Sequence, residues 1–259
     1  MKIQLAFYLC VAPVIAIADD AGRCPDTQSD LQKVEFNQKV TAGAVNAFID
    51  KYTECIPAWI TVTSSGGDAE AAMLLGDWIF KNRINIRVRS LCVSSCANYI
   101  FPAGRQKEIE PRALIIWHGS ALQKNFREFI SKYEAIQATD NSSPYLAENS
   151  LNYNSLLRII KKQNEFFAKI GVDESILRLG QEPFDFDTSG WSATLQVMKK
   201  YGINNISAPT NYGELSYFHA LLGLKYLFKG KFMSFTIGST GEIAPIPKEE
   251  INSLLESRR

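Results

Sequence analysis

Two adjacent serines lie between two cysteines in the segment LCVSSCANYIFPAG, residues 91–104. The serines are Ser94 and Ser95, and the cysteines are Cys92 and Cys96. A serine at the start of a helix is most often a cap that accepts a backbone hydrogen bond. At the turn from a strand into a helix, a serine hydroxyl can also act as a nucleophile once a base takes its proton. The rest of the chain must decide between these two roles.

The histidine content restricts which residue could be that base, because the chain has only two histidines. His118 ends the apolar stretch ALIIWHG, residues 113–119, whereas His219 lies in the aromatic stretch SYFHALLG, where we expect a packing role. Imidazole is the side chain most often used as a general base. His118 is therefore the candidate base, and the alternative is that it is a histidine of the core.

A third feature is the turn SSGGD, residues 64–68, which contains Gly66 and Gly67. A glycine pair between a strand and a helix is commonly only a structural turn. In α/β proteins, however, the loops at the carboxyl ends of parallel strands build the functional sites. The glycine pair, Ser95 and His118 each follow a predicted strand, so these three strand ends could converge on one site.

The elements that must position these residues alternate between strand and helix. Runs of β-branched and apolar residues predict strands, and apolar residues at helical spacing predict helices. The predicted strands cover 58–64, 85–92 and 113–119, with another near 232–238, and residues 19–40 are predicted as an irregular arm or an edge strand. The predicted helices cover 41–52, 69–82, a segment from Ser95 to Pro102, 155–171 and 190–203, whereas 105–111 is predicted as a polar turn and 120–155 has no clear periodicity. This order favours an α/β fold.

The first residues predict export from the cytoplasm. Lys2 precedes an apolar run over residues 3–18 that ends on the small residues of a cleavage site, as in a secretory signal peptide. No second stretch is long enough to span a bilayer, so no stable membrane span is expected. Lysines and arginines number 28 against 27 aspartates and glutamates, and this balance gives no reason to expect a nucleic-acid partner. The expected location is the bacterial periplasm.

The cysteine count agrees with an oxidising compartment. Cys10 is lost with the signal peptide, which leaves Cys24, Cys55, Cys92 and Cys96. Four cysteines allow three disulfide connectivities, and we expect Cys92–Cys96 together with Cys24–Cys55. The rival interpretation is a metal site that uses the two close cysteines and a histidine, but free thiolates rarely persist after export. We therefore expect no metal and no cofactor.

Three segments in order resemble the Clp-protease proteolytic-subunit family, within the crotonase-like superfamily. They are VTSSGGDAEAAMLLGDWIF, SSCANYIFPAG and PRALIIWHG. In that family the nucleophilic serine lies nine residues before the glycine of an Ala-Gly pair, which is the spacing from Ser95 to Gly104. The family's catalytic histidine lies seven residues after a proline, as His118 does after Pro111. Signal peptide peptidases of the same superfamily place a tyrosine four residues after their serine, where this chain has Tyr99.

The resemblance covers residues 56–120 well, 155–205 weakly and the residues after 210 not at all. It implies a crotonase-like α/β core of repeated strand–strand–helix units over residues 19–209, with a C-terminal extension over 210–259. It also implies Ser95 as nucleophile, with His118 as general base. The oxyanion would be held by backbone N–H groups, which the resemblance assigns to Gly67 and Cys96.

The third catalytic residue is less directly indicated. The family's aspartate precedes a helix that ends in Tyr-Gly, which Tyr201-Gly202 resembles, but an ungapped count falls on Gly190. Asp187 is the candidate acid, and Asp185 and Asp173 are the alternatives. The family's Ser-Pro-Gly-Gly motif also has a serine, Ser65, in place of its proline.

The expected function is that of an exported serine hydrolase, a peptidase acting on peptide or protein substrates. Because the acid is uncertain and the proline is absent, the alternative is a catalytically silent relative that binds peptides or a partner protein. An acyl-CoA enzyme of the crotonase type is a weaker third interpretation, because such enzymes need an acid near the glycine turn and a CoA pool. Members of the family often assemble into rings, so a homo-oligomer is possible, although the sequence fixes no stoichiometry.

Overall fold

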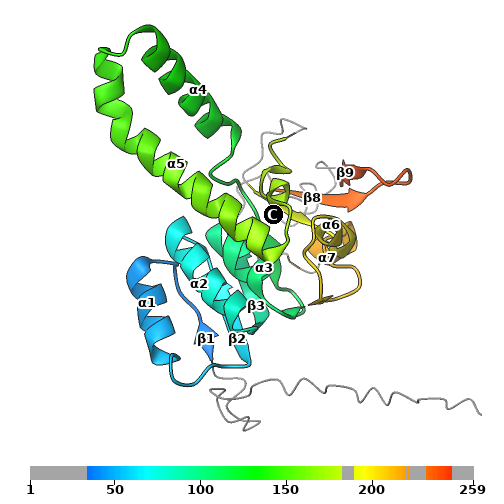
Figure 1. Cartoon of the computed structure of the whole chain (residues 1–259). Helices are drawn as coiled ribbons and strands as arrows, with labels where there is room; N and C mark the ends of the chain where they lie inside the picture. The colour runs from blue at the N-terminus through cyan, green and yellow to red at the C-terminus, as the bar shows by residue number, and fades with distance from the viewer. Residues whose placement is uncertain (1–33, 183–189, 220, 222–231, 247–259) are drawn as a thin grey trace, which may run out of the picture.

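The protein is a mixed α/β structure built on a mostly parallel sheet (Figure 1). The computed structural model describes residues 34–182, 190–219, 221 and 232–246. The central sheet has the strand order β1-β2-β3-β4-β7, with β5 paired to β3 beyond the end of β4, and all of these pairings are parallel. Its strands are β1 (Glu35–Phe36), β2 (Trp59–Ser64), β3 (Asn85–Val93), β4 (Lys107–Ile109), β5 (Leu114–Ile116) and β7 (Ile206–Ser207).

Two of the predicted helices lie next to this sheet, namely α1 (Ala42–Lys51) and α2 (Ala69–Lys81). Thr41 and Asp68 cap them by accepting hydrogen bonds from backbone N–H groups of the first turn. The buried face of α2 includes Leu75, Gly76 and Ile79, which have the helical spacing that predicted it. The helix predicted after Ser95 consists of a π-helix, η1 (Cys96–Ile100), that continues into the short helix α3 (Phe101–Ala103).

A long helical hairpin covers residues 124–170, and its first part lies in the segment that shows no clear periodicity. It consists of α4 (Lys124–Thr139) and α5 (Pro144–Ile170), and its tip projects away from the sheet (Figure 1). Tyr133 is the only buried residue of α4, and it stacks on Tyr153 of α5 with ring centroids 4.0 Å apart. A helix that buries so little shows no broad apolar stripe, which is why its periodicity was weak. The predicted helix 155–171 is confirmed as the second half of α5, and Gly171 ends it in the left-handed conformation.

Two predicted segments were wrong in detail. The polar turn predicted over 105–111 contains strand β4, in which Lys107 and Ile109 are buried. Lys107 Nζ donates hydrogen bonds to the carbonyls of Gly104, at 2.7 Å, and Asn204, at 3.0 Å, so burial leaves the ammonium group paired. Three residues, two of them charged, give too short a pattern to reveal a strand.

The helix predicted over 190–203 is instead a strand followed by a shorter helix. These elements are β6 (Gly190–Ala193) and α6 (Leu195–Lys200). All four residues of β6 are buried, including Ser192, so burial does not alternate along the strand and no period of two distinguishes it from a helix. Two short elements complete this part of the fold, η2 (Glu174–Arg178) before β6 and α7 (Leu215–His219) after β7.

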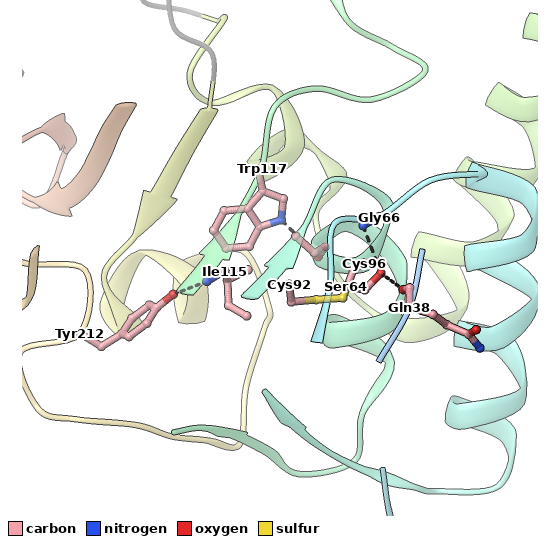
Figure 2. Close-up of a disulfide and its surroundings, with 9 residues drawn as sticks. Gln38, Ser64, Gly66, Cys92, Cys96, Ile115, Trp117 and Tyr212 are labelled. Carbon is pink, nitrogen blue, oxygen red and sulfur yellow. Dashed lines mark hydrogen bonds between the residues drawn. A yellow bond between two sulfur atoms is a disulfide. The ribbon is translucent and has the colours of Figure 1, made fainter. Parts of the chain in front are cut away.

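The described residues after 209 pack against the rest of the fold. The predicted strand near 232–238 is confirmed as β8 (Phe232–Ile237), which pairs in parallel with β6 and antiparallel with β9 (Ile243–Pro245). Tyr212 is fully buried and accepts a hydrogen bond from Ile115 N–H of β5 at 2.8 Å (Figure 2). The hydroxyl of Tyr217 donates to the Ala113 carbonyl at 2.6 Å. Residues on both sides of position 209 therefore contribute to one core.

No helix within the described ranges is both long and apolar enough to cross a membrane. The predicted signal peptide, residues 1–18, lies outside those ranges.

Candidate functional site

The three strand ends that the sequence singled out meet at one edge of the sheet. Strands β2, β3 and β5 are neighbours, with Ser64 in register with Cys92 and Val93 in register with Ile116. Because parallel strands present their carboxyl ends at the same edge, the residues after each strand come together. They line a pocket of about 650 Å³, whose wall includes Gly67, Ser95 and His118.

Ser95 immediately precedes the π-helix η1 at this pocket. Its side chain makes no capping hydrogen bond, so this serine does not act as a side-chain cap of the helix. The Ser95 hydroxyl is buried and has no hydrogen-bond partner among the described residues. A buried polar atom without a partner costs about 1–3 kcal/mol, and Ser95 Oγ is one of seven such side-chain atoms within the described residues.

Ser94 differs from Ser95 in its backbone rather than in its chemistry. Its φ is +59°, in the left-handed region that residues other than glycine seldom adopt. Its N–H donates to the carbonyl of Ile116 at 2.9 Å, which ties the serine turn to the end of β5. The strained residue therefore directs the chain into η1, and the next residue is Ser95.

The glycine turn after β2 approaches this serine turn very closely. Gly66 has φ +81°, and a Cβ at this position would lie 2.5 Å from the Val93 carbonyl oxygen. The hydroxyl of Ser64 donates to the Gln38 carbonyl at 2.6 Å and accepts from Gly66 N–H at 3.1 Å (Figure 2). Only glycine combines this conformation with this contact, so Gly66 is required by the approach of the two loops.

Gly67 lines the pocket, and Cys96 directly follows Ser95, which also lines it. At the bridge between Val40 and Gly67, Val40 N–H donates to the Gly66 carbonyl and Asp68 N–H donates to the Val40 carbonyl, both at 2.9 Å. Cys96 is the first residue of η1, and it lies within the turn that Asn98 N–H closes on the Ser94 carbonyl at 2.8 Å. Backbone N–H groups in the first turn of a helix have no acceptor inside the helix. The assignment of an oxyanion hole to Gly67 and Cys96 stays a prediction from resemblance.

The predicted pair Cys92 and Cys96 lies at disulfide distance, with an S–S separation of 2.01 Å and Cα atoms 5.2 Å apart (Figure 2). Both residues are fully buried, and the bond connects the end of β3 to the start of η1. Because the two sulfurs are bonded to each other, they are not free thiolates for a metal ion. Cys55 is also disulfide-bonded, but Cys24 lies outside the described residues, so the Cys24–Cys55 pairing stays a prediction.

His118 follows β5 and has an exposed side chain at the edge of the pocket. Its neighbour Trp117 is fully buried and forms a two-hydrogen-bond bridge with Trp191, at 2.8 and 2.9 Å. The indole N–H of Trp117 also donates to the Ala97 carbonyl at 3.2 Å. The backbone that carries His118 is therefore attached both to β6 and to the helix that follows Ser95.

Of the three candidate acids, only Asp173 lies within the residues that the structure describes. Asp173 caps η2, because its carboxylate accepts from Ser175 N–H at 2.9 Å, and it does not line the pocket. Asp185 and Asp187 lie outside the described residues. Gln181 and Trp191 are described residues on either side of these aspartates. Gln181 Nε2 donates to the carbonyl of His118, the candidate base, at 3.3 Å, and Trp191 pairs with Trp117.

Tyr99 has a structural environment rather than a catalytic one. It is buried, its ring packs edge-on against Phe166, and its hydroxyl donates to Gln163 Oε1 at 2.8 Å. Burial raises the pKa of the Tyr99 hydroxyl well above its usual value, so it stays protonated.

The outer wall of the pocket comes from the helical hairpin, and sequence reasoning missed it. Its side chains are Phe126 and Phe129 of α4 and Asn152, Ser155, Leu156 and Ile159 of α5. Their spacings of three and four residues mark one face of each helix, and this is the signal that could have identified them. Among the described residues that line the pocket there is no lysine, arginine, aspartate or glutamate.

In comparisons with known proteins, no family model and no curated protein matches this chain.

Proposed function

We propose that the protein is a serine hydrolase, a peptidase in which Ser95 is the nucleophile and His118 the general base. The observation that carries the proposal is the convergence of three parallel strand ends on one pocket that is lined by Gly67, Ser95 and His118. The buried Ser95 hydroxyl without a partner supports the same role, because no structural hydrogen bond accounts for it.

The proposed reaction begins with a rotation of the Ser95 side chain, because its hydroxyl makes no hydrogen bond to His118 in the structure. The rotated hydroxyl gives its proton to His118 and attacks the substrate carbonyl carbon. The carbonyl oxygen becomes an oxyanion that accepts hydrogen bonds from Gly67 N–H and Cys96 N–H. His118 then protonates the leaving amine, and a water molecule, activated by the same histidine, hydrolyses the acyl-enzyme and regenerates Ser95.

Asp187 is proposed as the acid that orients His118. The proposal is supported by the hydrogen bonds that hold Gln181 and Trp191, on either side of this segment, beside His118 and Trp117. An acid in this role fixes the tautomer of the imidazole and stabilises its protonated form.

The pocket lining supports an uncharged, apolar substrate residue next to the cleaved bond. Phe126, Phe129, Leu156 and Ile159 supply apolar surface, and a charged substrate group would lose its hydration there without gaining a partner. Peptides with leucine, methionine or phenylalanine at this position are the proposed substrates.

The finer assignments of fold and location also belong to the proposal. A parallel α/β core with the nucleophile between a strand and a helix agrees with the resemblance to the Clp-protease proteolytic subunit and the crotonase-like superfamily. The Cys92–Cys96 pair is compatible with an exported protein, and we propose the periplasm as its location. A homo-oligomer stays a proposal from resemblance alone.

The test is covalent labelling of the purified mature protein with a fluorophosphonate probe at neutral pH. We expect one label at Ser95, no label in Ser95→Ala, and full labelling in the matched control Ser94→Ala. Asp187→Asn should label at least about tenfold more slowly than Asp173→Asn, because only Asp187 is proposed to orient the base. Absence of any label in the folded wild-type protein would contradict the proposed hydrolase.

A second candidate function is supported by the missing hydrogen bond between Ser95 and His118. If rotation of Ser95 does not bring its hydroxyl to the imidazole, the same pocket would bind peptides without cleaving them. A protein that binds an apolar peptide equally well as wild type and as Ser95→Ala, and that takes no label, would be this silent binder.

A further inference from the structure

The backbone that follows His118 is held by two buried side-chain amides. Asn98 Nδ2 donates to the Gly119 carbonyl at 2.9 Å, and Ala121 N–H donates to Gln163 Oε1 at a longer 3.4 Å. Asn98 is 4% exposed and Gln163 is fully buried. Buried amides are costly to place in a core unless their hydrogen bonds are needed, so these two require an explanation.

The orientation of the Asn98 amide follows from its partner. A backbone carbonyl can only accept, so the NH₂ group of Asn98 must face Gly119 and its Oδ1 must face away. Asn98 lies one turn after Ser95, and its own N–H donates to the Ser94 carbonyl at 2.8 Å. One helical turn therefore carries both the proposed nucleophile and a donor that holds the loop of the proposed base.

Gln163 connects the same loop to the same helix from the other side. Its Oε1 also accepts the Tyr99 hydroxyl at 2.8 Å, and Tyr99 belongs to η1. Because Gln163 lies on α5, which packs on α2, the connection is anchored in the core rather than in another loop. The Ala121 hydrogen bond is the longer one, so Asn98 is the stronger of the two attachments.

The exposed side chain of His118 makes this backbone attachment important. A buried histidine is oriented by its packing, whereas an exposed one takes its position from the backbone that carries it. We propose that Asn98 and Gln163 are positioning residues that fix His118 relative to Ser95. The inference rests on the proposed function for its catalytic meaning, but the attachment itself can be measured without catalysis.

The first test compares Asn98→Leu with wild type, because leucine has nearly the same size as asparagine and lacks the donor. With the p-nitrophenyl ester of N-acetyl-leucine, we expect kcat to fall about 10- to 100-fold while KM changes less than about twofold. Fluorophosphonate labelling should slow by the same factor. The matched control is Asn149→Leu, since Asn149 bonds only the Tyr145 carbonyl of its own helix and does not line the pocket.

A second variant, Asn98→Asp, separates positioning from folding. A protonated aspartic acid can still donate to the Gly119 carbonyl, whereas an ionised one repels it. The labelling rate relative to wild type should therefore fall as pH rises through the pKa of the new carboxyl group, at temperatures where both proteins are fully folded. A ratio that does not vary with pH would contradict the positioning role.

The third measurement requires no activity at all. The chain has only two histidines, so the imidazole NMR signals of His118 and His219 can be assigned with a single His219→Gln variant. Asn98→Leu should shift or broaden the His118 signals and leave those of His219 in place. If the wild type neither labels nor hydrolyses the ester, the proposed function fails and this comparison still decides the positioning. Unchanged His118 signals would overturn it.

Discussion

At the scale of single residues, the serine turn is held by an unusual number of constraints. The positive φ of Ser94, the close approach of Gly66 and the Cys92–Cys96 bond all act on the residues on either side of Ser95. Strained backbone of this kind costs about 1–3 kcal/mol for each residue and persists only where the surrounding structure enforces it. The disulfide is the constraint that can be removed most cleanly.

We predict that Cys92→Ala with Cys96→Ala affects the site more than the fold. The two cysteines are only four positions apart, so the loop-entropy contribution of their bond is about 2 kcal/mol. Locally, its loss frees the N–H of Cys96 from a fixed position, and we expect labelling of Ser95 to slow at least about tenfold. Labelling rate and thermal unfolding, measured on the same samples, check this.

The matched control for the disulfide is Cys24→Ala with Cys55→Ala, which alters the other predicted pair. That variant should lower the melting temperature without slowing the labelling of the folded protein. If both double variants slow labelling equally, the Cys92–Cys96 bond has no special role at the serine.

At the scale of elements, the pocket joins a rigid sheet edge to a projecting hairpin. The sheet edge supplies Gly67, Ser95 and His118, whereas α4 and α5 supply most of the apolar wall. Tyr133 is the only buried residue of α4, so the distal hairpin depends on its pairing with α5. Changes in the wall should therefore alter selectivity before they alter the fold.

We predict that Leu156→Lys reduces kcat/KM for substrates with an apolar residue at least about tenfold. The substitution places a charge on the apolar wall, and the loss corresponds to roughly 1–3 kcal/mol of apolar contact and desolvation. The control is Leu151→Lys on the same helix, because Leu151 is 81% exposed and does not line the pocket. Equal effects of the two substitutions would contradict the assignment of this wall.

The elements also show which parts of the molecule were readable from the sequence. Strands β2 and β3 and helix α2 were predictable because each has an apolar pattern of one period, bounded by turn residues. Strand β6 was mistaken for helix because complete burial removes alternation, and α4 was missed because a projecting helix needs little apolar surface.

The residues of the candidate site also include some that were predictable from the sequence and some that were not. Ser95, His118 and the glycine turn could be brought together from the rule that parallel strands end at one edge. Asn98 and Gln163 could not, because their contacts depend on how α5 packs on α2 and places Gln163 beside η1. No local pattern encodes that packing.

At the scale of the whole molecule, Lys107 links stability to pH. Burial lowers the pKa of its ammonium group to about 8, from an ordinary value of 10.5. Below pH 8 the lysine is charged in both the folded and the unfolded chain, and the cost of burying the charge is present. Between about pH 8 and 10.5 only the unfolded chain holds the proton, so this residue makes the free energy of unfolding rise with pH.

We predict that Lys107 makes the free energy of unfolding rise by about 2 kcal/mol as the pH is raised from 7.5 to 9.5. Urea unfolding at both pH values checks this when Lys107→Met is measured beside wild type. Burial raises the pKa of Tyr99, Tyr212 and Tyr217, whose ionisation in the unfolded chain lowers stability at high pH. The tyrosine effect is the same in wild type and in Lys107→Met, so it cancels when the free energy of unfolding of one protein is subtracted from that of the other. If this difference does not change with pH, the prediction is contradicted.

The hairpin described above has a consequence for how such a molecule can diversify. Its α4 and the first half of α5 form one uninterrupted insertion between β5 and the part of α5 that packs on α2. Exchanging this insertion for another would replace the surface that we propose meets the substrate side chain, while leaving the strand ends and their hydrogen bonds in place. The proposed reaction and the substrate preference would thus be determined by separate parts of the chain. A chimaera made at these boundaries would keep the reaction and acquire a new substrate preference.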